Sequence, residues 1–161
     1  MAGEDKEEFP PLLAPGFHEL GIDGVKRLCV DRFAQSLTRR LIMKNLHELI
    51  EMAQREEIRG IFWIDGSFLT DKLNPDDVDL VLVIEQSEFR KMTPRARKFF
   101  DWFKSTDLYP DYKCDNYHFI QGGPVENEYT YAYWLRQFGF NRPATAMKGL
   151  AVVNIPYVVK P

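Results

Sequence analysis

Apolar residues along the chain follow two periods, one helical and one typical of strands, and these place most of the predicted elements. A spacing near 3.6 residues predicts a long amphipathic helix that Ser36 can cap. Its apolar positions are Leu37, Leu41, Ile42, Leu46, Leu49, Ile50 and Ala53. A shorter helix is predicted over residues 22–33. After Gly60, residues 61–64 predict a short strand, and the nearly continuous apolar run 78–84 predicts a strand covered on both faces.

The second half of the chain alternates between the same two patterns. Residues 93–105 predict a helix with a Thr-Pro start and three phenylalanines on its inner face. Residues 111–120 predict a strand, 128–138 a helix, and 150–159 a strand interrupted by Pro156. The order is helices first, then strand, strand, helix, strand, helix and strand. This order predicts an α+β fold, a small mixed β-sheet with helices packed against it.

Length and composition fit a single domain. The chain has 161 residues, of which 45% are apolar and 14% aromatic, and this is enough for one core. Residues 1–16 are charged and then rich in proline, so we expect an extended N-terminal arm followed by one domain over 17–161. The start of the chain is acidic rather than a signal peptide, and the longest apolar run, Leu80–Ile84, is too short to span a membrane. We therefore expect a cytoplasmic protein without membrane association.

Charge and cysteine content narrow the function classes. A net charge of −3 argues against broad attraction to nucleic acid, while a basic cluster at residues 90–98 leaves open either a local phosphate contact or a solvated helix face. Cys29 and Cys114 stand in apolar surroundings and are predicted to be free buried thiols, as is usual in a reducing compartment. No paired cysteines and only three separated histidines argue against a zinc site.

The segment that carries candidate chemistry joins the two central predicted strands. The first strand ends in Gly66-Ser67, and Asp77 and Asp79 open the second. Side chains at positions i and i+2 of a strand point to the same face, so these two carboxylates converge. They repel each other unless a divalent cation lies between them, and Mg²⁺ prefers carboxylates together with substrate phosphates. The Gly-Ser turn suits such phosphates, because glycine lets the backbone come close and serine offers a hydroxyl and an N–H.

Three other kinds of local structure can contain such residues. The two aspartates after Asn74-Pro75 could be ordinary turn chemistry. An EF-hand loop starting at Asp71 is excluded, because its alternate positions lack ligands and its sixth position is not glycine. A Walker A loop is excluded because no Gly-Lys-Ser/Thr follows Gly66.

The Gly-Ser turn, nine residues, then Asp-x-Asp and an apolar strand resemble the signature of the DNA polymerase β-like nucleotidyltransferase superfamily. Asp115 stands where that superfamily has a third carboxylate on a later strand. More narrowly, the chain is similar to a group of short, uncharacterised bacterial nucleotidyltransferase-like proteins. The matching pieces are residues 14–18, the turn 66–72, and a tail with Trp134, Phe138-Gly139, Arg142 and Lys148-Gly149. The resemblance implies a minimal nucleotidyltransferase fold.

The resemblance also implies a reaction and roles for residues. Asp77 and Asp79 would hold two Mg²⁺ ions, and Asp115 would hold the catalytic one and help to deprotonate the acceptor. Lys72, Arg142 and Lys148 are candidates for the triphosphate oxygens, although basic loop residues are commonly just solvated. The expected substrate is a nucleoside triphosphate, and the expected acceptor is a protein or an RNA.

One departure from the superfamily supports a second hypothesis. Most members carry a second, helical domain that grips the base, and only about forty residues follow Ile120 here. A minimal domain of this kind could instead be a non-catalytic or conditional binding module. It would belong to a two-gene system, such as a toxin–antitoxin pair or a defence pair, and would act through contact with a partner protein.

Overall fold

The computed structural model describes residues 7–122, 126–141 and 147–155. The strands are β1 (Gly16–Glu19), β2 (Ile61–Asp65), β3 (Val78–Glu85), β4 (Cys114–Gln121) and β5 (Gly149–Asn154). The α-helices are α1 (Ile22–Lys26), α2 (Arg39–Arg55), α3 (Gln86–Arg90), α4 (Pro94–Ser105), α5 (Tyr109–Tyr112) and α6 (Glu126–Gly139). A π-helical turn, η1 (Arg27–Asp31), continues α1, and a 3₁₀ turn, η2 (Ser67–Leu69), follows β2.

The strands form one five-stranded sheet in the order β1-β5-β2-β3-β4. β1 with β5 and β3 with β4 run parallel, whereas β2 runs antiparallel to both of its neighbours. The predicted α+β fold with a mixed sheet is therefore confirmed. The predicted order was wrong at its start, because β1 precedes the first helix. Its four residues have no clear period of their own, and they become a strand by pairing with β5.

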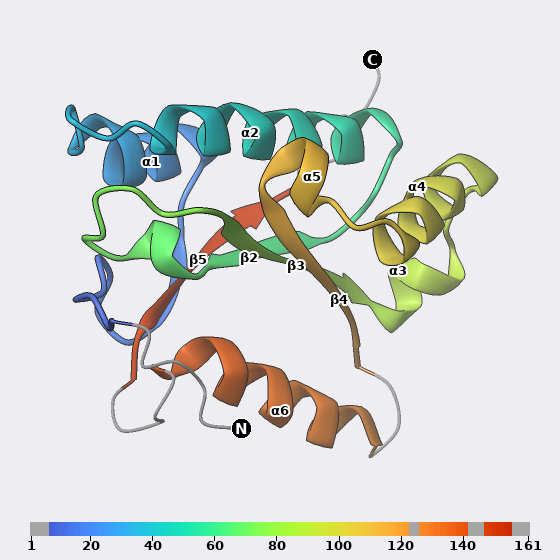
Figure 1. The fold of residues 1–161 in the computed structure, drawn as a ribbon. Helices are drawn as coiled ribbons and strands as arrows, with labels where there is room; N and C mark the ends of the chain where they lie inside the picture. Colours follow the sequence, from blue (N-terminus) through green and yellow to red (C-terminus); the bar gives the residue numbers. More distant parts are fainter. Residues whose placement is uncertain (1–6, 123–125, 142–146, 156–161) are drawn as a thin grey trace.

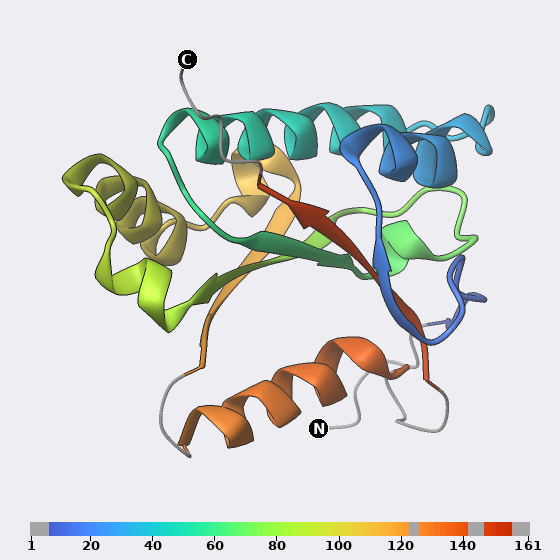
Figure 2. The same ribbon diagram turned by 180° about the vertical axis from the view of Figure 1, so that it is seen from behind.

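Two layers of side chains cover the sheet, one on each face. In Figure 1, α2 crosses one face and α6 crosses the other, and Figure 2 shows the same sandwich from behind. The larger core joins α2 and α4 to side chains such as Phe62, Leu80 and Leu82. The smaller core joins Phe138 of α6 to side chains such as Trp63. The interior strand β3 is thus buried from both sides, which explains its nearly continuous apolar sequence.

Helix α2 differs from its prediction at its first turn. Leu37 lies before the helix and is 90% exposed, and Leu41 lies on the outer face at 52% exposed. The inward position is taken by Arg39, which is fully buried. Ser36 still serves the helix start, because its hydroxyl oxygen accepts a hydrogen bond from the Arg39 N–H at 3.2 Å.

The remaining elements follow their predictions with shifted ends. Helix α4 has the predicted Thr-Pro start, with the Thr93 hydroxyl accepting from the Ala96 N–H at 3.1 Å, and its three phenylalanines are buried. The strand expected from residue 111 begins only at Cys114, because a helical turn and Lys113 at φ 52° come first. The last strand ends at Asn154, and residues 156–161 lie outside the described part of the chain.

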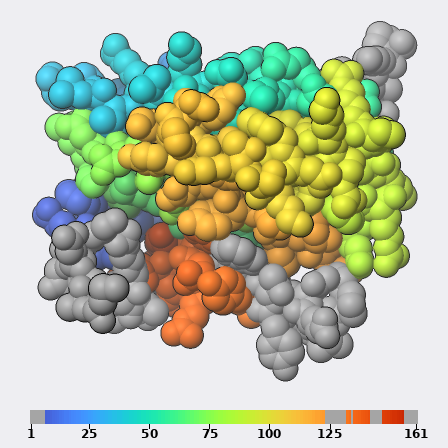
Figure 3. All heavy atoms as spheres, turned by 45° about the vertical axis from the view of Figure 1, so that its right-hand side comes forward, coloured from blue at the N-terminus to red at the C-terminus, as the bar shows by residue number. Residues whose placement is uncertain are grey.

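Two further expectations concern the cysteines and the membrane. Cys29 and Cys114 are free and buried, as predicted, and burial raises the pKa of the Cys29 thiol to about 12. Among the described residues, no helix has the length and apolar character that crossing a membrane requires. In Figure 3 the yellow and orange atoms of the segment from α4 to β4 cover one side of the molecule below α2.

Candidate functional site

Three aspartates stand side by side on neighbouring strands and form a row across one end of the sheet. Asp65, the last residue of β2, pairs with Asp79 of β3, and Asp79 pairs in turn with Asp115 of β4. Each lies two positions from a residue of the smaller core, Trp63, Val81 or Tyr117. Because strand side chains alternate, the aspartates share the sheet face that α6 covers.

Asp77 adds a fourth carboxylate just before β3. The structure brings the three predicted carboxylates together, because Asp77, Asp79 and Asp115 each place an oxygen within 4.8 Å of the others. All three are partly exposed, so a small ion can reach them from solvent. This donor set, oxygen only and anionic, fits a hard divalent cation such as Mg²⁺.

Asp79 is the residue of this cluster whose pKa is raised most clearly by its surroundings. Burial raises its pKa to about 7, and the negative charges of Asp65, Asp77 and Asp115 act in the same direction. The ammonium of Lys148 opposes the shift. Asp79 therefore keeps its proton to a higher pH than an isolated carboxyl group does, and a cation bound at this point would replace that proton.

Gly66 is required here by the carboxylate cluster itself. Its φ of +86° is disfavoured for other residues, and a Cβ at this position would lie 2.9 Å from Oδ2 of Asp79. The backbone therefore packs directly against the Asp79 side chain. Ser67 then opens η2. The predicted contact of Gly66 and Ser67 with phosphate remains a prediction, and the structure supplies an independent reason for the glycine.

A buried arginine that the sequence analysis missed fixes the loop between Ser67 and Asp77. The guanidinium of Arg39 donates to the carbonyl oxygens of Phe68, Thr70 and Lys72 at 2.6–2.7 Å, and to that of Cys29 at 2.9 Å. It also lies over the Phe33 ring, 3.7 Å from its centroid. Arg39 stands on the buried face of α2, three and four positions before Ile42 and Met43. A charged residue at an otherwise apolar helix position is unusual, and this is the feature by which the sequence could have indicated its role.

The N-terminal arm holds the same loop from its other side. The Leu12 N–H donates to the Leu69 carbonyl at 2.8 Å, and the Asp71 N–H donates to the Pro10 carbonyl at 3.0 Å. Lys72, a predicted phosphate ligand, places its ammonium 5.9 Å from the centroid of the Phe9 ring on this arm. Of the other predicted phosphate ligands, Arg142 lies outside the described residues.

Lys148 is the predicted phosphate ligand that the structure places beside the carboxylates. Its ammonium lies 2.8 Å from Oδ2 of Asp65. Asp65 is 1% exposed, and neither of its oxygens makes a well-aligned hydrogen bond within the described part of the chain. Burial raises the Asp65 pKa to about 6, against the opposing effects of Lys148 and the Gly66 backbone amide. The sequence analysis missed Asp65, although a carboxylate ending an apolar strand directly before Gly66 was the signal.

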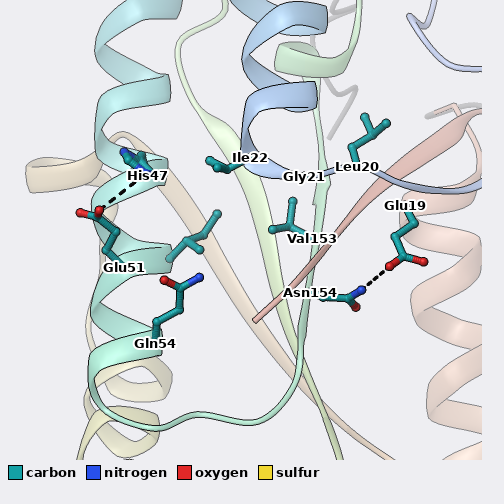
Figure 4. Close-up of a pocket in the computed structure, with 10 residues that line it drawn as sticks. Glu19, Leu20, Gly21, Ile22, His47, Glu51, Gln54, Val153 and Asn154 are labelled. Carbon is teal, nitrogen blue, oxygen red and sulfur yellow. Dashed lines mark hydrogen bonds and ion pairs between the residues drawn. The ribbon is translucent and has the colours of Figure 1, made fainter. Parts of the chain in front are cut away.

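Two hollows in the surface lie at the opposite end of the strands. One, of about 300 Å³, is bordered by polar residues that include Glu19, His47, Glu51 and Asn154. Figure 4 shows two linked pairs at its border, His47 with Glu51 on α2 and Glu19 of β1 with Asn154 of β5. The other, of about 410 Å³, is lined by Gly60, Glu85 and Gln121, among others. Since Asn154 pairs with Ile61 at the start of β2, whereas Asp65 ends β2, neither hollow touches the carboxylates.

Comparison with known proteins places the chain in a family. A family model described as a family of unknown function (DUF6932) matches residues 7–154, and the chain belongs to this family. No curated protein and no solved structure matches the chain. The match includes residues 7–16 of the arm, the Gly66 turn, all four aspartates and Lys148, so these features lie within the segment that defines membership.

Proposed function

We propose that this protein is a Mg²⁺-dependent nucleotidyltransferase that moves a nucleoside monophosphate from a nucleoside triphosphate to a hydroxyl group of a protein or RNA acceptor. The observation that carries the proposal is the convergence of Asp77, Asp79 and Asp115 within 4.8 Å, beside the Gly66-Ser67 turn. A carboxylate cluster next to a close-packed turn suits metal-assisted phosphoryl chemistry.

The cluster is suited to this reaction by its charge. Mg²⁺, when bound by Asp77, Asp79 and Asp115, would neutralise charge on the attacked phosphate and on the leaving group. The acceptor oxygen forms a bond to the α-phosphorus while the bond from that phosphorus to the bridging oxygen breaks, and pyrophosphate leaves. The acceptor proton passes to a carboxylate of the cluster, for which Asp115 is the candidate. The Ser67 hydroxyl and the Lys148 ammonium are candidates for holding the phosphate oxygens.

Binding of nucleotide tests the proposal first. We expect isothermal titration with the four ribonucleoside triphosphates to show binding in the presence of Mg²⁺ and little without it. Asp77→Asn and Asp79→Asn variants should weaken the Mg²⁺-dependent binding at least about a hundredfold, since even outer partners of metal ligands contribute 10–100-fold to metal affinity. Asp76→Asn is the matched control, because Asp76 is the exposed neighbour in the same loop.

Transfer of label tests the reaction itself. Triphosphates labelled at the α-phosphate are incubated with the protein and with protein and RNA acceptors, and acid-stable label on an acceptor is the expected product. A folded wild type that binds no triphosphate and labels no acceptor contradicts the proposal. The conditional binding module then becomes the better hypothesis, and capture of one partner protein, unchanged in the Asp77→Asn/Asp79→Asn variant, would identify it.

A further inference from the structure

The ion pair between Asp65 and Lys148 joins a buried side chain to a partly exposed one. The Asp65 side chain is 2% exposed, whereas that of Lys148 is 21% exposed, and their charged atoms are 2.8 Å apart. A lysine on the surface keeps its flexible stem mobile, and holding it in one place has an entropic cost. Here a buried carboxylate at the end of β2 pairs with the ammonium of a side chain that remains partly exposed to solvent.

The backbone around Lys148 is fixed as well. The Lys148 N–H donates to the carbonyl of Gly139, at the end of α6, at 2.9 Å. The next residue, Gly149, pairs with Gly16 of β1, and a Cβ there would overlap the backbone of Ala14. The end of α6, the first pair of β1 with β5, and Asp65 therefore hold Lys148 from three sides.

The direction in which Lys148 is held places its charge at the carboxylate cluster. Asp65 is the cross-strand neighbour of Asp79, so an ammonium on Asp65 lies at the edge of the row that leads to Asp115. Lys148 opposes the raised pKa of both Asp65 and Asp79, which means that its charge acts on both groups. The charges of Asp65 and Lys148 offset each other, which leaves Asp77, Asp79 and Asp115 as the candidate ligands of a cation.

We propose that Asp65 is a positioning residue that holds the Lys148 ammonium at the edge of the carboxylate cluster, where the ammonium binds a phosphate group of the ligand. Asp65 is then not a fourth metal ligand, although it is the most buried carboxylate of the row. This inference rests on the proposed function, because it requires a phosphate ligand at Asp77, Asp79 and Asp115. It deepens that function by naming the cation that meets the phosphate and the residue that aims it.

The test separates binding of phosphate from binding of metal. Magnesium tripolyphosphate is the first probe, because it carries the phosphates without a base, and its dissociation constant is measured by isothermal titration. Mn²⁺ alone is the second probe, and its binding is followed by electron paramagnetic resonance. The variants are Asp65→Asn, Lys148→Met, the double variant, and Lys148→Arg, which retains the positive charge. Asp76→Asn is the exposed control, and circular dichroism confirms that each variant is folded.

The expected pattern differs between the two probes. Asp65→Asn and Lys148→Met should each weaken tripolyphosphate binding about tenfold, the range for one charged hydrogen bond, and Lys148→Arg should restore much of it. Because Asp65 acts through Lys148, the double variant should be no weaker than Lys148→Met. Binding of Mn²⁺ should survive in all of these variants, and Lys148→Met should not weaken it, since a repelling charge is removed.

Several outcomes would overturn the inference. Loss of Mn²⁺ binding in Asp65→Asn, or additive losses in the double variant, would make Asp65 an independent metal ligand. Unchanged tripolyphosphate binding in Lys148→Met would make the ion pair merely structural, with the nucleotidyltransferase proposal intact. A wild type that binds Mn²⁺ but neither tripolyphosphate nor any nucleoside triphosphate would overturn both proposals. A wild type that binds tripolyphosphate as expected but transfers no nucleotide would overturn only the proposed reaction.

Discussion

Arg39 and Asp65 are both charged and almost completely buried, yet their surroundings differ. Arg39 is 0% exposed and donates four hydrogen bonds to backbone carbonyls, while only its Nε lacks a partner among the described residues. Asp65 is 1% exposed and forms an ion pair with Lys148, but within the described part of the chain its oxygens make no well-aligned hydrogen bond. A buried charge saturated by backbone groups stabilises a scaffold. A buried charge with few partners, among other carboxylates, is typical of a site that binds a ligand.

The two residues also serve different parts of one segment. Arg39 fixes the carbonyls of the loop over residues 68–72, which follows the Gly66 turn. Asp65 precedes that turn and faces the carboxylate cluster. The scaffold and the candidate site therefore meet at Gly66, and substitutions on either side should have different signatures in stability and in ligand binding.

Loss of Arg39 should have the largest effect on stability. Arg39→Met leaves the carbonyls of Cys29, Phe68, Thr70 and Lys72 without this donor, and we expect a loss of about 3–5 kcal/mol in the free energy of unfolding, measured by urea denaturation. Arg39→Lys should have a stability between those of the wild type and Arg39→Met, because one ammonium group cannot reproduce the planar set of donors of the guanidinium. A loss below about 0.5 kcal/mol for Arg39→Met, the range of ordinary surface substitutions, would mean that Arg39 does not stabilise this loop.

Substitution of Gly66 should affect both stability and metal binding. Gly66→Ala places a Cβ against Oδ2 of Asp79 at φ +86°, ψ −166°, and we expect a loss of about 1–3 kcal/mol together with weaker Mn²⁺ binding. Gly21→Ala is the matched control, because nothing lies within 4 Å of a Cβ there and its φ is −70°. Full stability and unchanged Mn²⁺ binding in Gly66→Ala would show that the turn and the cluster are not mechanically linked.

The carboxylate cluster should make stability depend on pH when no divalent cation is present. The Asp79 pKa is about 7 in the folded state and near 3.8 when unfolded, so the folded state binds more protons between these values. Its contribution to stability is complete below pH 4 and is lost as the pH rises through 7. His118 acts oppositely below its ordinary pKa of 6.5, because burial lowers its pKa. The clearest window is therefore pH 6.5 to 8, where we expect the melting temperature to fall.

Two comparisons isolate the cause of that pH dependence. Asp79→Asn should melt at a higher temperature than the wild type at pH 8 and should lose most of the fall between pH 6.5 and 8. Mg²⁺ should raise the wild-type melting temperature more at pH 8 than at pH 6.5, since a metal ligand must be deprotonated. Equal melting curves for wild type and Asp79→Asn at both pH values would mean that the cluster carries no electrostatic strain.

Asp65→Asn should have the smallest effect on stability, less than about 1 kcal/mol, because the charge that remains is on Lys148, a flexible side chain that is already partly exposed. Lys148→Met should cost more, and more at pH 8 than at pH 5, since it leaves a buried carboxylate uncompensated. Thermal unfolding of both variants at the two pH values measures this asymmetry. If Asp65→Asn lowers the free energy of unfolding as much as Arg39→Met does, Asp65 stabilises the fold in the same way as Arg39, and the contrast between the two buried charges is wrong.

Sequence patterns predicted the elements whose signals are local. The helix α4, the strand β3 and the central strand β2 follow from period and capping alone. The face of α2 was only partly predicted, because Leu37 and Leu41 were assigned to the core and lie outside it. Arg39 was overlooked because a charged side chain is normally placed on the surface, whereas here backbone carbonyls from a distant loop satisfy it. The strand β1 was missed because its pairing partner lies over a hundred residues away.

The sequence by itself determined that Asp77 and Asp79 point to one face and that Gly66 makes a turn beside them, because strand alternation and glycine geometry act within a few residues. Only the tertiary structure decided that Asp115 and Asp65 flank Asp79, since this depends on the register of β3 with β4 and with β2. It also placed Lys148 on Asp65 and directed Lys72 toward the arm. Long side chains reach whatever the packed elements bring near, and packing is a property of the whole chain.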